Sequence, residues 1–202
     1  FSIYAIIPFV FYLIREQMMQ EAQLIRENNA LVQELQETQD EAKHDFLTGC
    51  YNRFQLEPSY ERFASLAHEK GFSFSYAIFD IDHFKEVNDT RGHLGGDHAL
   101  RGVAESVLSR IDRRHIFIRY GGDEFILLGL HYDLEAMSAF CERLRAILEE
   151  RMGGVTLSFG VSTWHGGCDS LPGLIARADR ALYRSKEKGR NSVSTEDEAA
   201  CC

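Results

Sequence analysis

Residues 119–128 read RYGGDEFILL, and this stretch decides the fold. The apolar residues before it, 116–118, and those at its end, 125–128, each predict a buried strand. Two glycines between them allow the left-handed backbone of a tight hairpin without steric cost. The sequence therefore predicts a hairpin with Gly121 and Gly122 at its tip, and a bare tip lets a ligand approach the backbone closely.

Two acidic pairs lie where strands end. Asp123 and Glu124 are predicted to open the returning strand of the hairpin, and Asp80 and Asp82 close the apolar run over 72–82. Alternation places Asp80 and Asp82 on one face of their strand. We expect both pairs to meet at one edge of the sheet, although each pair alone is equally typical of solvated turn residues.

The remaining elements give the fold class. An amphipathic helix is expected up to about Lys70, after a Thr-Gly turn. A strand follows at 72–82, and residues 84–111 are expected to form a short helix, a Gly-rich turn and a longer helix. After these come the hairpin at 115–130, a helix at 133–150, a strand at 154–163, a helix at 171–189 ending at Gly189, and a last short strand at 191–194. From the first of these strands the order is β-α-β-β-α-β-α. That order predicts an α+β, ferredoxin-like split βαβ fold, a largely antiparallel sheet with helices on one face. In this fold the first and third strands are neighbours, so the strand with Asp80 lies beside the hairpin.

Clustered carboxylates indicate a divalent cation site. Like charges this close repel unless something neutralises them, and oxygen ligands suit Mg²⁺ or Mn²⁺. Two such ions between carboxylates and a nucleoside triphosphate can activate a 3′-hydroxyl, hold the phosphates and neutralise the leaving pyrophosphate. The net charge of -9 argues against nonspecific nucleic-acid binding, which needs a basic surface.

Four blocks of sequence together resemble the GGDEF family of diguanylate cyclases. Residues 119–125 (RYGGDEF) match the signature, and the blocks DFLTG at 45–49 with Asn52-Arg53, FDIDHFKEVNDTRGHLGGDHAL at 79–100 and ADRALYRSKEKGRN at 178–191 agree in order and spacing. The resemblance covers 45 to about 194. It implies a palm-like domain with helices surrounding a mostly antiparallel sheet, which condenses two GTP into cyclic di-GMP.

The resemblance also implies roles for single residues. Asp80, Asp123 and the backbone carbonyl of Ile81 would hold two Mg²⁺ or Mn²⁺ ions, and Asp123 or Glu124 would help deprotonate the GTP 3′-hydroxyl. Asn88 and Asp97 would read the guanine edge, since a carboxylate accepts from its N–H groups. The substrate-binding set is Phe84, Lys85, Asn88, His93, Asp97, Gly121, Gly122, Lys186 and Arg190, in which the three cations contact phosphates and Phe84 and His93 lie beside the nucleotide.

Several of these residues also have a plain structural reading. Lys186 and Arg190 are four apart at a helix end, where cations are favourable anyway. His93 fits a turn and Asn88 a helix cap. Arg119 fits structural pairing with a carboxylate as well as it fits nucleotide binding.

An inhibitory motif, RxxD, precedes the signature in many family members. The corresponding window here is Asp112-Arg113-Arg114-His115, which lacks Arg at its first position and Asp at its last. We therefore expect no inhibitory site of that kind. Arg110, Arg113 and Arg114 are read as a solvated basic corner rather than as an unconventional phosphate site.

The N-terminal segment carries a different pattern. Residues 1–14 are uncharged and shorter than a bilayer span, so we expect the cytoplasmic end of a transmembrane helix; a hydrophobic helix packed on another subunit or domain is the alternative. Residues 15–44 predict a coiled-coil signalling linker. One register contains Leu24, Leu31, Leu35 and Ala42 with polar Asn28 and Thr38, and a second contains Ile14, Met18, Ile25, Val32 and Leu35. A solvated helix with one packed register is the alternative.

The expected protein is a homodimer joined through this helix, with residues 45–194 as the catalytic domain at the cytoplasmic face of the bacterial inner membrane. Residues 195–202 are expected to be a disordered tail. A catalytically inactive module that senses GTP or cyclic di-GMP is the alternative function, and intact Asp80, Asp123 and Glu124 argue against it. A cyclase of adenine-containing dinucleotides is a third reading, which the carboxylate of Asp97 disfavours.

Overall fold

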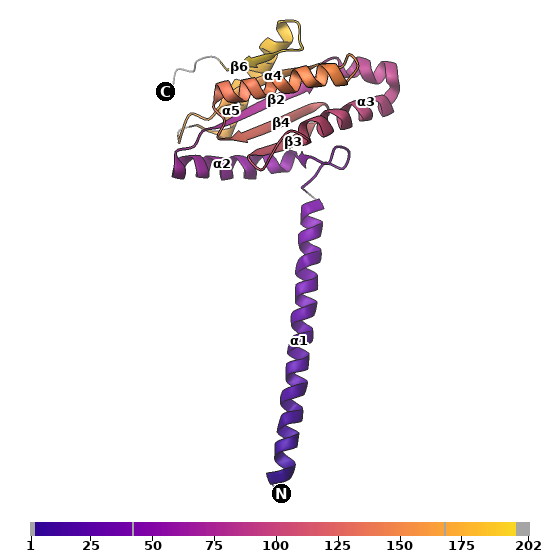
Figure 1. Cartoon of the computed structure of the whole chain (residues 1–202), viewed down its shortest axis with the longest axis vertical. Coiled ribbons are helices and arrows are strands. Elements are labelled where there is room, and N and C mark those ends of the chain that lie inside the picture. The colour runs from indigo at the N-terminus through magenta and orange to yellow at the C-terminus, as the bar shows by residue number, and fades with distance from the viewer. Residues whose placement is uncertain (1–2, 42, 168, 197–202) are drawn as a thin grey trace. The chain divides into compact units, whose positions relative to one another are not determined.

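The computed structural model describes residues 3–41, 43–167 and 169–196 (Figure 1). The chain divides into two compact units, Phe1–Lys43 and His44–Cys202. The first contains a single helix and the second contains all the strands.

Helix α1 runs without interruption over Ile3–Glu41. Its described apolar side chains are exposed, including Leu24, Leu31, Ile25 and Val32, which belong to the two expected registers. The side chains of Leu35, Thr38 and Ala42 lie outside the described residues. Within the part of the chain that the structure describes, no helix is both long and apolar enough to cross a bilayer.

The second unit is a six-stranded sheet surrounded by helices. Its strands lie in the order β1-β3-β4-β2-β5-β6, with β2 beside β4 as expected. The four central strands are antiparallel and the two outer strands pair in parallel. The bounds are β1 Tyr51–Asn52, α2 Leu56–Lys70, β2 Phe74–Ile81, α3 Phe84–Leu108, β3 His115–Gly121, β4 Glu124–Leu130, α4 Leu134–Arg151, β5 Leu157–Thr163, α5 Leu171–Glu187 and β6 Val193–Thr195, with a 3-10 turn at Arg53–Gln55. The α+β split βαβ class is confirmed.

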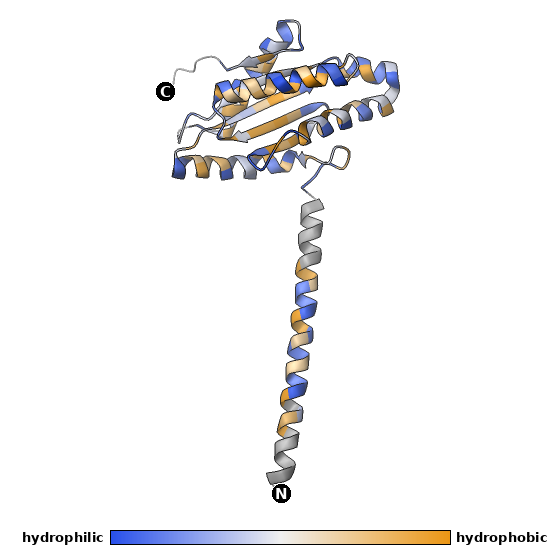
Figure 2. Cartoon of the chain, in the orientation of Figure 1, coloured by the Kyte–Doolittle hydropathy of each residue, from blue (hydrophilic) through white to orange (hydrophobic). Residues whose placement is uncertain are grey.

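Helices cover both faces of the sheet, so the expectation of helices on one face was wrong. One core cluster contains α3 and α4 side chains such as Val103 and Leu144, and the other contains α2 and α5 side chains such as Phe63 and Leu182. Figure 2 shows the strands in the orange of apolar residues between helices whose surfaces carry more blue. Burial on both faces explains why all eight residues of β2 are buried.

Helix α5 lies directly on the sheet at Gly160. A Cβ added there would lie 2.1 Å from the carbonyl oxygen of Ala178 and 2.3 Å from the backbone nitrogen of Leu182. A glycine is therefore required, because any side chain would push the helix off β5. This close approach lets side chains from the last turns of α5 reach the end of β2.

The hairpin turn lies one residue later than expected. Strand β3 continues through Gly121, and a bulge after Arg119 brings Gly121 opposite Glu124. Gly122 has φ 55°, whereas Gly121 is not among the residues with positive φ. The turn is therefore Gly122-Asp123, and Asp123 precedes the returning strand instead of opening it.

The ordered chain extends past the expected start of the tail. Thr195 belongs to β6, and the side chain of Glu196 is buried, where it pairs with Arg177 and with His165 at 3.0 Å. These ion pairs anchor the chain end, so the expectation of disorder from 195 was wrong for both residues. Residues 197–202 lie outside the described residues.

Candidate active site

The candidate site begins with two carboxylates on neighbouring strands. Asp80 near the end of β2 and Glu124 at the start of β4 are direct register partners, and Ser158 of β5 lies on the other side of Asp80. Directly opposite residues of an antiparallel pair share one face. Asp80 and Glu124 therefore lie side by side, and Asp123 stands in the adjacent turn.

Lys186 supplies the compensating charge. Its ammonium group forms an ion pair with Oδ2 of Asp80, reaching from α5 to the sheet. Burial raises the pKa of Asp80, the ion pair with Lys186 lowers it, and the charges of Asp123 and Asp82 raise it again. The net direction is upward, so Lys186 does not fully offset the burial of this carboxylate.

Glu124 is destabilised as an anion by the same cluster. Burial raises its pKa, and the charges of Asp80 and Asp123 raise it further. A carboxylate with a raised pKa is a stronger base once it is ionised. The cluster thus holds a group suited to accept a proton, next to other carboxylates.

The carboxylates fit a divalent cation. Oδ1 of Asp80 is buried and has no hydrogen-bond partner, which is costly unless a ligand binds it. Carboxylate oxygens are the ligands that Mg²⁺ and Mn²⁺ prefer. Within the described residues, no group of three or more His, Cys, Asp or Glu side chains is placed so that these side chains alone could hold a metal ion. The remaining oxygen ligands would have to come from the backbone, such as the carbonyl of Ile81, or from the substrate.

Asp82 lies close to this cluster, since its charge helps to raise the pKa of Asp80, but its oxygens already have protein partners. Its carboxylate accepts hydrogen bonds from the hydroxyls of Ser158 at 2.6 Å and Thr156 at 2.8 Å, and from the backbone N–H of Asn191 at 3.0 Å. The backbone N–H of Asp82 also donates to the carbonyl oxygen of Thr156 at 2.9 Å, so pairing with the segment before β5 continues past Ile81. Asp82 instead ties the end of β2 to β5 and to the loop after α5.

A kink in α3 packs the two segments that carry the predicted guanine-reading residues against each other. Gly92, with φ 70° and ψ 172°, divides the helix into the expected short and long parts. The second part folds back closely, since a Cβ added at Gly96 would lie 2.1 Å from Oδ1 of Asn88 and 3.2 Å from the ring of Phe84. Asp97 follows Gly96 in the chain. Phe84, Asn88 and Asp97 thus come from segments that pack on each other.

The start of α3 lies in the chain between the carboxylate of Asp80 and the residues predicted to read guanine. Only Asp82 and His83 separate the end of β2 from Phe84, and His83 adopts the left-handed conformation. A helix start of this kind offers backbone N–H groups to an anion. Lys85, His93 and Arg190 are exposed. Within the described residues, none of their side chains forms a hydrogen bond or ion pair with the carboxylates or with the predicted guanine-reading residues.

Arg119 has a structural position. Its guanidinium donates to the carbonyl oxygen of Gly122 and to the carboxylate of Asp45, which also accepts from the backbone N–H and hydroxyl of Thr48. Burial raises the pKa of Asp45, but the hydrogen bonds from Thr48 and Arg119 outweigh it and leave the pKa below its usual value. Of the two readings of Arg119, the geometry supports pairing with a carboxylate.

Two further residues were missed by the sequence reasoning. Asp179 lies two helical turns before Lys186, and its charge helps to raise the pKa of Glu124. Tyr76 lies on the same face of β2 as Asp80, and its hydroxyl is buried without a partner. Burial raises the pKa of Tyr76, and the charges of Asp179, Tyr120 and Glu124 add to this. Two spacings in the sequence could have indicated these residues. Asp179 precedes Lys186 by seven residues on the helix, and Tyr76 precedes Asp80 by four residues on the strand.

The basic corner before β3 is internally paired. Asp112 accepts hydrogen bonds from the backbone and side chain of Arg114 and pairs with His115 at 3.0 Å. Hydrogen bonds from Arg114 lower the pKa of Asp112. Asp112 is the carboxylate closest in sequence to the position where the RxxD motif has its Asp, and it already has a guanidinium partner.

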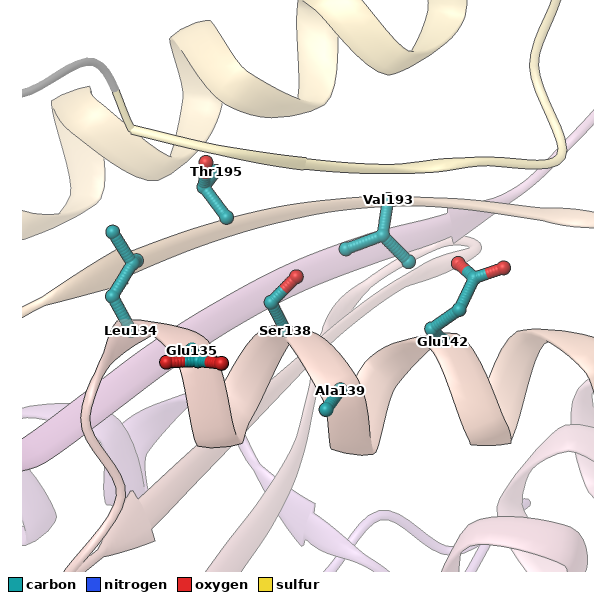
Figure 3. A pocket seen from close by; sticks show the side chains of 7 residues that line it. All are labelled: Leu134, Glu135, Ser138, Ala139, Glu142, Val193 and Thr195. Carbon is teal, nitrogen blue, oxygen red and sulfur yellow. The ribbon is translucent and has the colours of Figure 1, made fainter.

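A larger hollow lies away from the carboxylates. It has a volume of about 560 Å³ and is lined from α4 by Leu134, Glu135, Ser138, Ala139 and Glu142, and from β6 by Val193 and Thr195. Figure 3 shows these side chains along the groove between the helix and the edge strand. None of the predicted site residues lines it, so it is not the candidate site.

Comparison with known proteins places these features in one family. Residues 42–192 match the family model "Diguanylate cyclase, GGDEF domain". Diguanylate cyclase VdcA of Vibrio cholerae is 37% identical over 177 residues, which are 83% of this chain and 51% of that protein. Diguanylate cyclase A of Treponema denticola is 39% identical over 133 residues, 62% of this chain and 36% of that protein. The chain spans about half or less of the length of these relatives.

Solved structures agree with the fold. The coiled coil and GGDEF domain of DgcB from Caulobacter crescentus, in complex with c-di-GMP, superposes with a TM-score of 0.81 at 31% identity, covering 87% of this chain and 97% of that chain. The active GGEEF domain of a diguanylate cyclase from Vibrio cholerae superposes with a TM-score of 0.69 at 30% identity, covering 74% of this chain and 99% of that chain.

Proposed function

This chain belongs to the GGDEF-domain family of diguanylate cyclases, and from that membership we propose that it condenses two GTP molecules into cyclic di-GMP with release of two pyrophosphates. One observation carries the proposal for this chain. A buried, unpartnered oxygen of Asp80 lies next to Glu124, its register partner, and both have raised pKa values. The acidic residues of the signature are present, and the register of β2 and β4 supports a role for Asp80 and Glu124 in one site.

The proposed reaction forms one phosphodiester bond at a time. The 3′-oxygen of one GTP bonds to the α-phosphorus of the other, and the bond from that phosphorus to the bridging oxygen breaks, so pyrophosphate leaves. The proton of the 3′-hydroxyl passes to the carboxylate of Glu124 or Asp123. Repeating the step with the roles exchanged closes the ring.

Divalent cations are part of the proposal. Two Mg²⁺ ions per site, or Mn²⁺ in their place, would be held by Asp80, Asp123 and the carbonyl of Ile81. When bound, they would polarise the phosphate and neutralise the leaving group. Lys186 would move from Asp80 to the phosphates, because a cation among the carboxylates replaces its charge. Lys85 and Arg190 would add phosphate contacts.

Substrate recognition is assigned to the kinked helix. Asn88 and Asp97 would hydrogen-bond to the guanine edge, with Phe84 and His93 beside the nucleotide. Gly121 at the end of β3 and Gly122 in the turn leave the backbone open to the phosphates, since a Cβ added at either glycine would meet nothing within 4 Å. The carboxylate of Asp97 favours guanine over adenine.

Each domain would hold one GTP, so two domains must face each other. The exposed apolar residues of α1 support a homodimer joined by a coiled coil of this helix. We place the catalytic domain at the cytoplasmic face of the inner membrane, with a membrane anchor before residue 15. A shift between dimer arrangements would then control whether the two sites meet.

Turnover tests the proposal. The purified chain is incubated with GTP and Mg²⁺, and cyclic di-GMP is measured by chromatography beside an Asp123→Ala variant. Product from the unmodified chain alone supports the cyclase and the site together. Absence of product at high protein concentration, with GTP still bound, would instead support the sensing module.

A further inference from the structure

Three aromatic side chains surround the hairpin turn on the surface. Phe46 is 97% exposed, Phe54 70% and Tyr120 40%. Together they line an open hollow of about 390 Å³ whose wall includes Gly121 and Gly122. We name these three side chains the aromatic rim. Single exposed apolar residues are ordinary, but a cluster around one hollow marks an interaction site.

The aromatic rim is held in place by hydrogen bonds. The side chain of Asn52 accepts from the backbone N–H of Phe54 at 3.1 Å. Phe46 lies in a turn closed by backbone hydrogen bonds between Asp45 and Gly49 and between Asp45 and Cys50, each 2.8 Å long. These bonds hold the backbone at Phe46 and Phe54, so less backbone entropy is lost when a partner covers the rim.

The charge around the rim suits a second copy of the chain. The whole chain has a net charge of -9, so two copies repel over most surfaces. The wall of the hollow contains one acid, Asp45, which already pairs with Arg119. Arg53 lies over the ring of Phe54, with 5.0 Å from its guanidinium carbon to the ring centroid. Two acidic molecules can therefore approach through this face with little repulsion.

We propose that the aromatic rim is the surface through which the catalytic domains of two chains contact each other while their nucleotides react. This inference rests on the proposed function, in which nucleotides on two domains must meet. In the proposed function the hairpin turn lies beside the substrate, so a domain that covers the rim would bring its own nucleotide to the reacting end. Helix α1 of the same chain is the competing occupant.

Turnover and nucleotide binding separate the rim from the substrate site. The double substitution Phe46→Ser and Phe54→Ser is compared with Leu108→Ser, which changes an apolar residue 41% exposed at the end of α3. The probe is 3′-deoxy-GTP with Mg²⁺, which binds but lacks the nucleophile. We expect its dissociation constant to change less than about twofold in both variants, and turnover to fall at least about tenfold only in the double variant.

Cross-linking identifies the occupant. Cys168, Cys201 and Cys202 are replaced by Ser, and the chain then carries Phe54→Cys or, as the control, Leu108→Cys; Cys50 and Cys141 are buried. A short bis-maleimide is added with 3′-deoxy-GTP and Mg²⁺ present. We expect links between two copies of residues 44–202 from position 54 and none from position 108.

Three results would overturn the inference. They are equal cross-linking at both positions, links from position 54 to residues 1–43, and full turnover by the double variant. The cross-link is read without turnover, so it stands even where the unmodified chain makes no product. Absence of product refutes the proposed function, whereas full turnover by the double variant refutes only the role of the rim.

Discussion

The guanidinium of Arg119 donates twice to the carbonyl oxygen of Gly122, from Nε at 3.1 Å and from Nη2 at 2.8 Å. The third donor, Nη1, reaches Asp45 at 3.1 Å. One side chain therefore joins the turn that precedes Glu124 to the loop where the second unit begins. A displacement of that loop would disturb the turn, because the guanidinium can hydrogen-bond to both Gly122 and Asp45 only in this position.

We expect Arg119→Lys to loosen the turn while keeping the charge. Lysine offers a point charge in place of the planar fork, so it cannot hold both partners in the same way. Turnover should fall about tenfold with little change in KM, and the melting temperature should fall by a few degrees. Arg113→Lys, at an exposed position, is the matched control. Unchanged kinetics in Arg119→Lys would show that turnover does not depend on the hydrogen bonds that Arg119 makes to the turn.

Gly122→Ala and Gly121→Ala should differ in stability. A Cβ meets nothing within 4 Å at either position, but only Gly122 has a positive φ, of 55°. Alanine at 122 should therefore cost about 1–2 kcal/mol of unfolding free energy, and alanine at 121 very little. Gly122→Asn should recover part of the loss. Denaturant unfolding measures all three, and equal losses at both positions would contradict the turn geometry.

Asp80→Asn should separate stability from function. Burial raises the pKa of Asp80, so a neutral amide removes a charge that folding disfavours. We expect the melting temperature without ligand to stay the same or rise, and turnover to be lost. The stabilisation by GTP with Mg²⁺ should also disappear in thermal shifts. A variant that is stabilised by GTP and Mg²⁺ as the unmodified chain is would exclude Asp80 as a ligand.

Acid should weaken the attachment of the loop before α5 to that helix. Burial raises the pKa of Asp169, but hydrogen bonds, first from Arg177, outweigh it and leave the pKa below 3.8. A lowered folded-state pKa gives stability that is complete above 3.8 and is lost as the pH falls through the folded value. Asp169→Asn should cost about 2 kcal/mol at pH 6 and less near pH 3. A loss that is independent of pH would refute this account.

Cyclic di-GMP should inhibit the protein only weakly. The window before β3 lacks the inhibitory motif, and Asp112 already pairs with Arg114 at 2.8 Å. Initial rates are measured with increasing product, for the unmodified chain and for Arg114→Ala. An inhibition constant in the low micromolar range or below would contradict the prediction.

Local patterns predicted most of the fold. The strand over 72–82, the divided helix within 84–111 and the hairpin follow from periodicity and glycine placement, and the structure confirms them. Strand β1 was missed because two residues, Tyr51 and Asn52, carry no readable period. The face covered by each helix was also not predictable, since an amphipathic helix packs equally well on either side of a sheet.

The site was predicted by residue type more than by arrangement. The split βαβ order correctly placed Asp80 beside the hairpin, but it gave no sign that the carboxylate of Asp82 accepts hydrogen bonds from Ser158 and Thr156. The bulge after Arg119 moved Asp123 into the turn, and a bulge leaves no periodic signal. The ion pair of Asp80 with Lys186 joins residues far apart in the chain, so only the folded structure reveals it.

The order of the strands separates the route into the second unit from the route out. The chain enters at the edge formed by β1, next to β3 and the hairpin turn, and it leaves at the opposite edge, through β6. A module fused before the second unit would therefore join the sheet closer to the hairpin than a module fused after it. One fused upstream adjoins the hairpin through β1, whereas one fused downstream follows β6 at the far edge of the sheet.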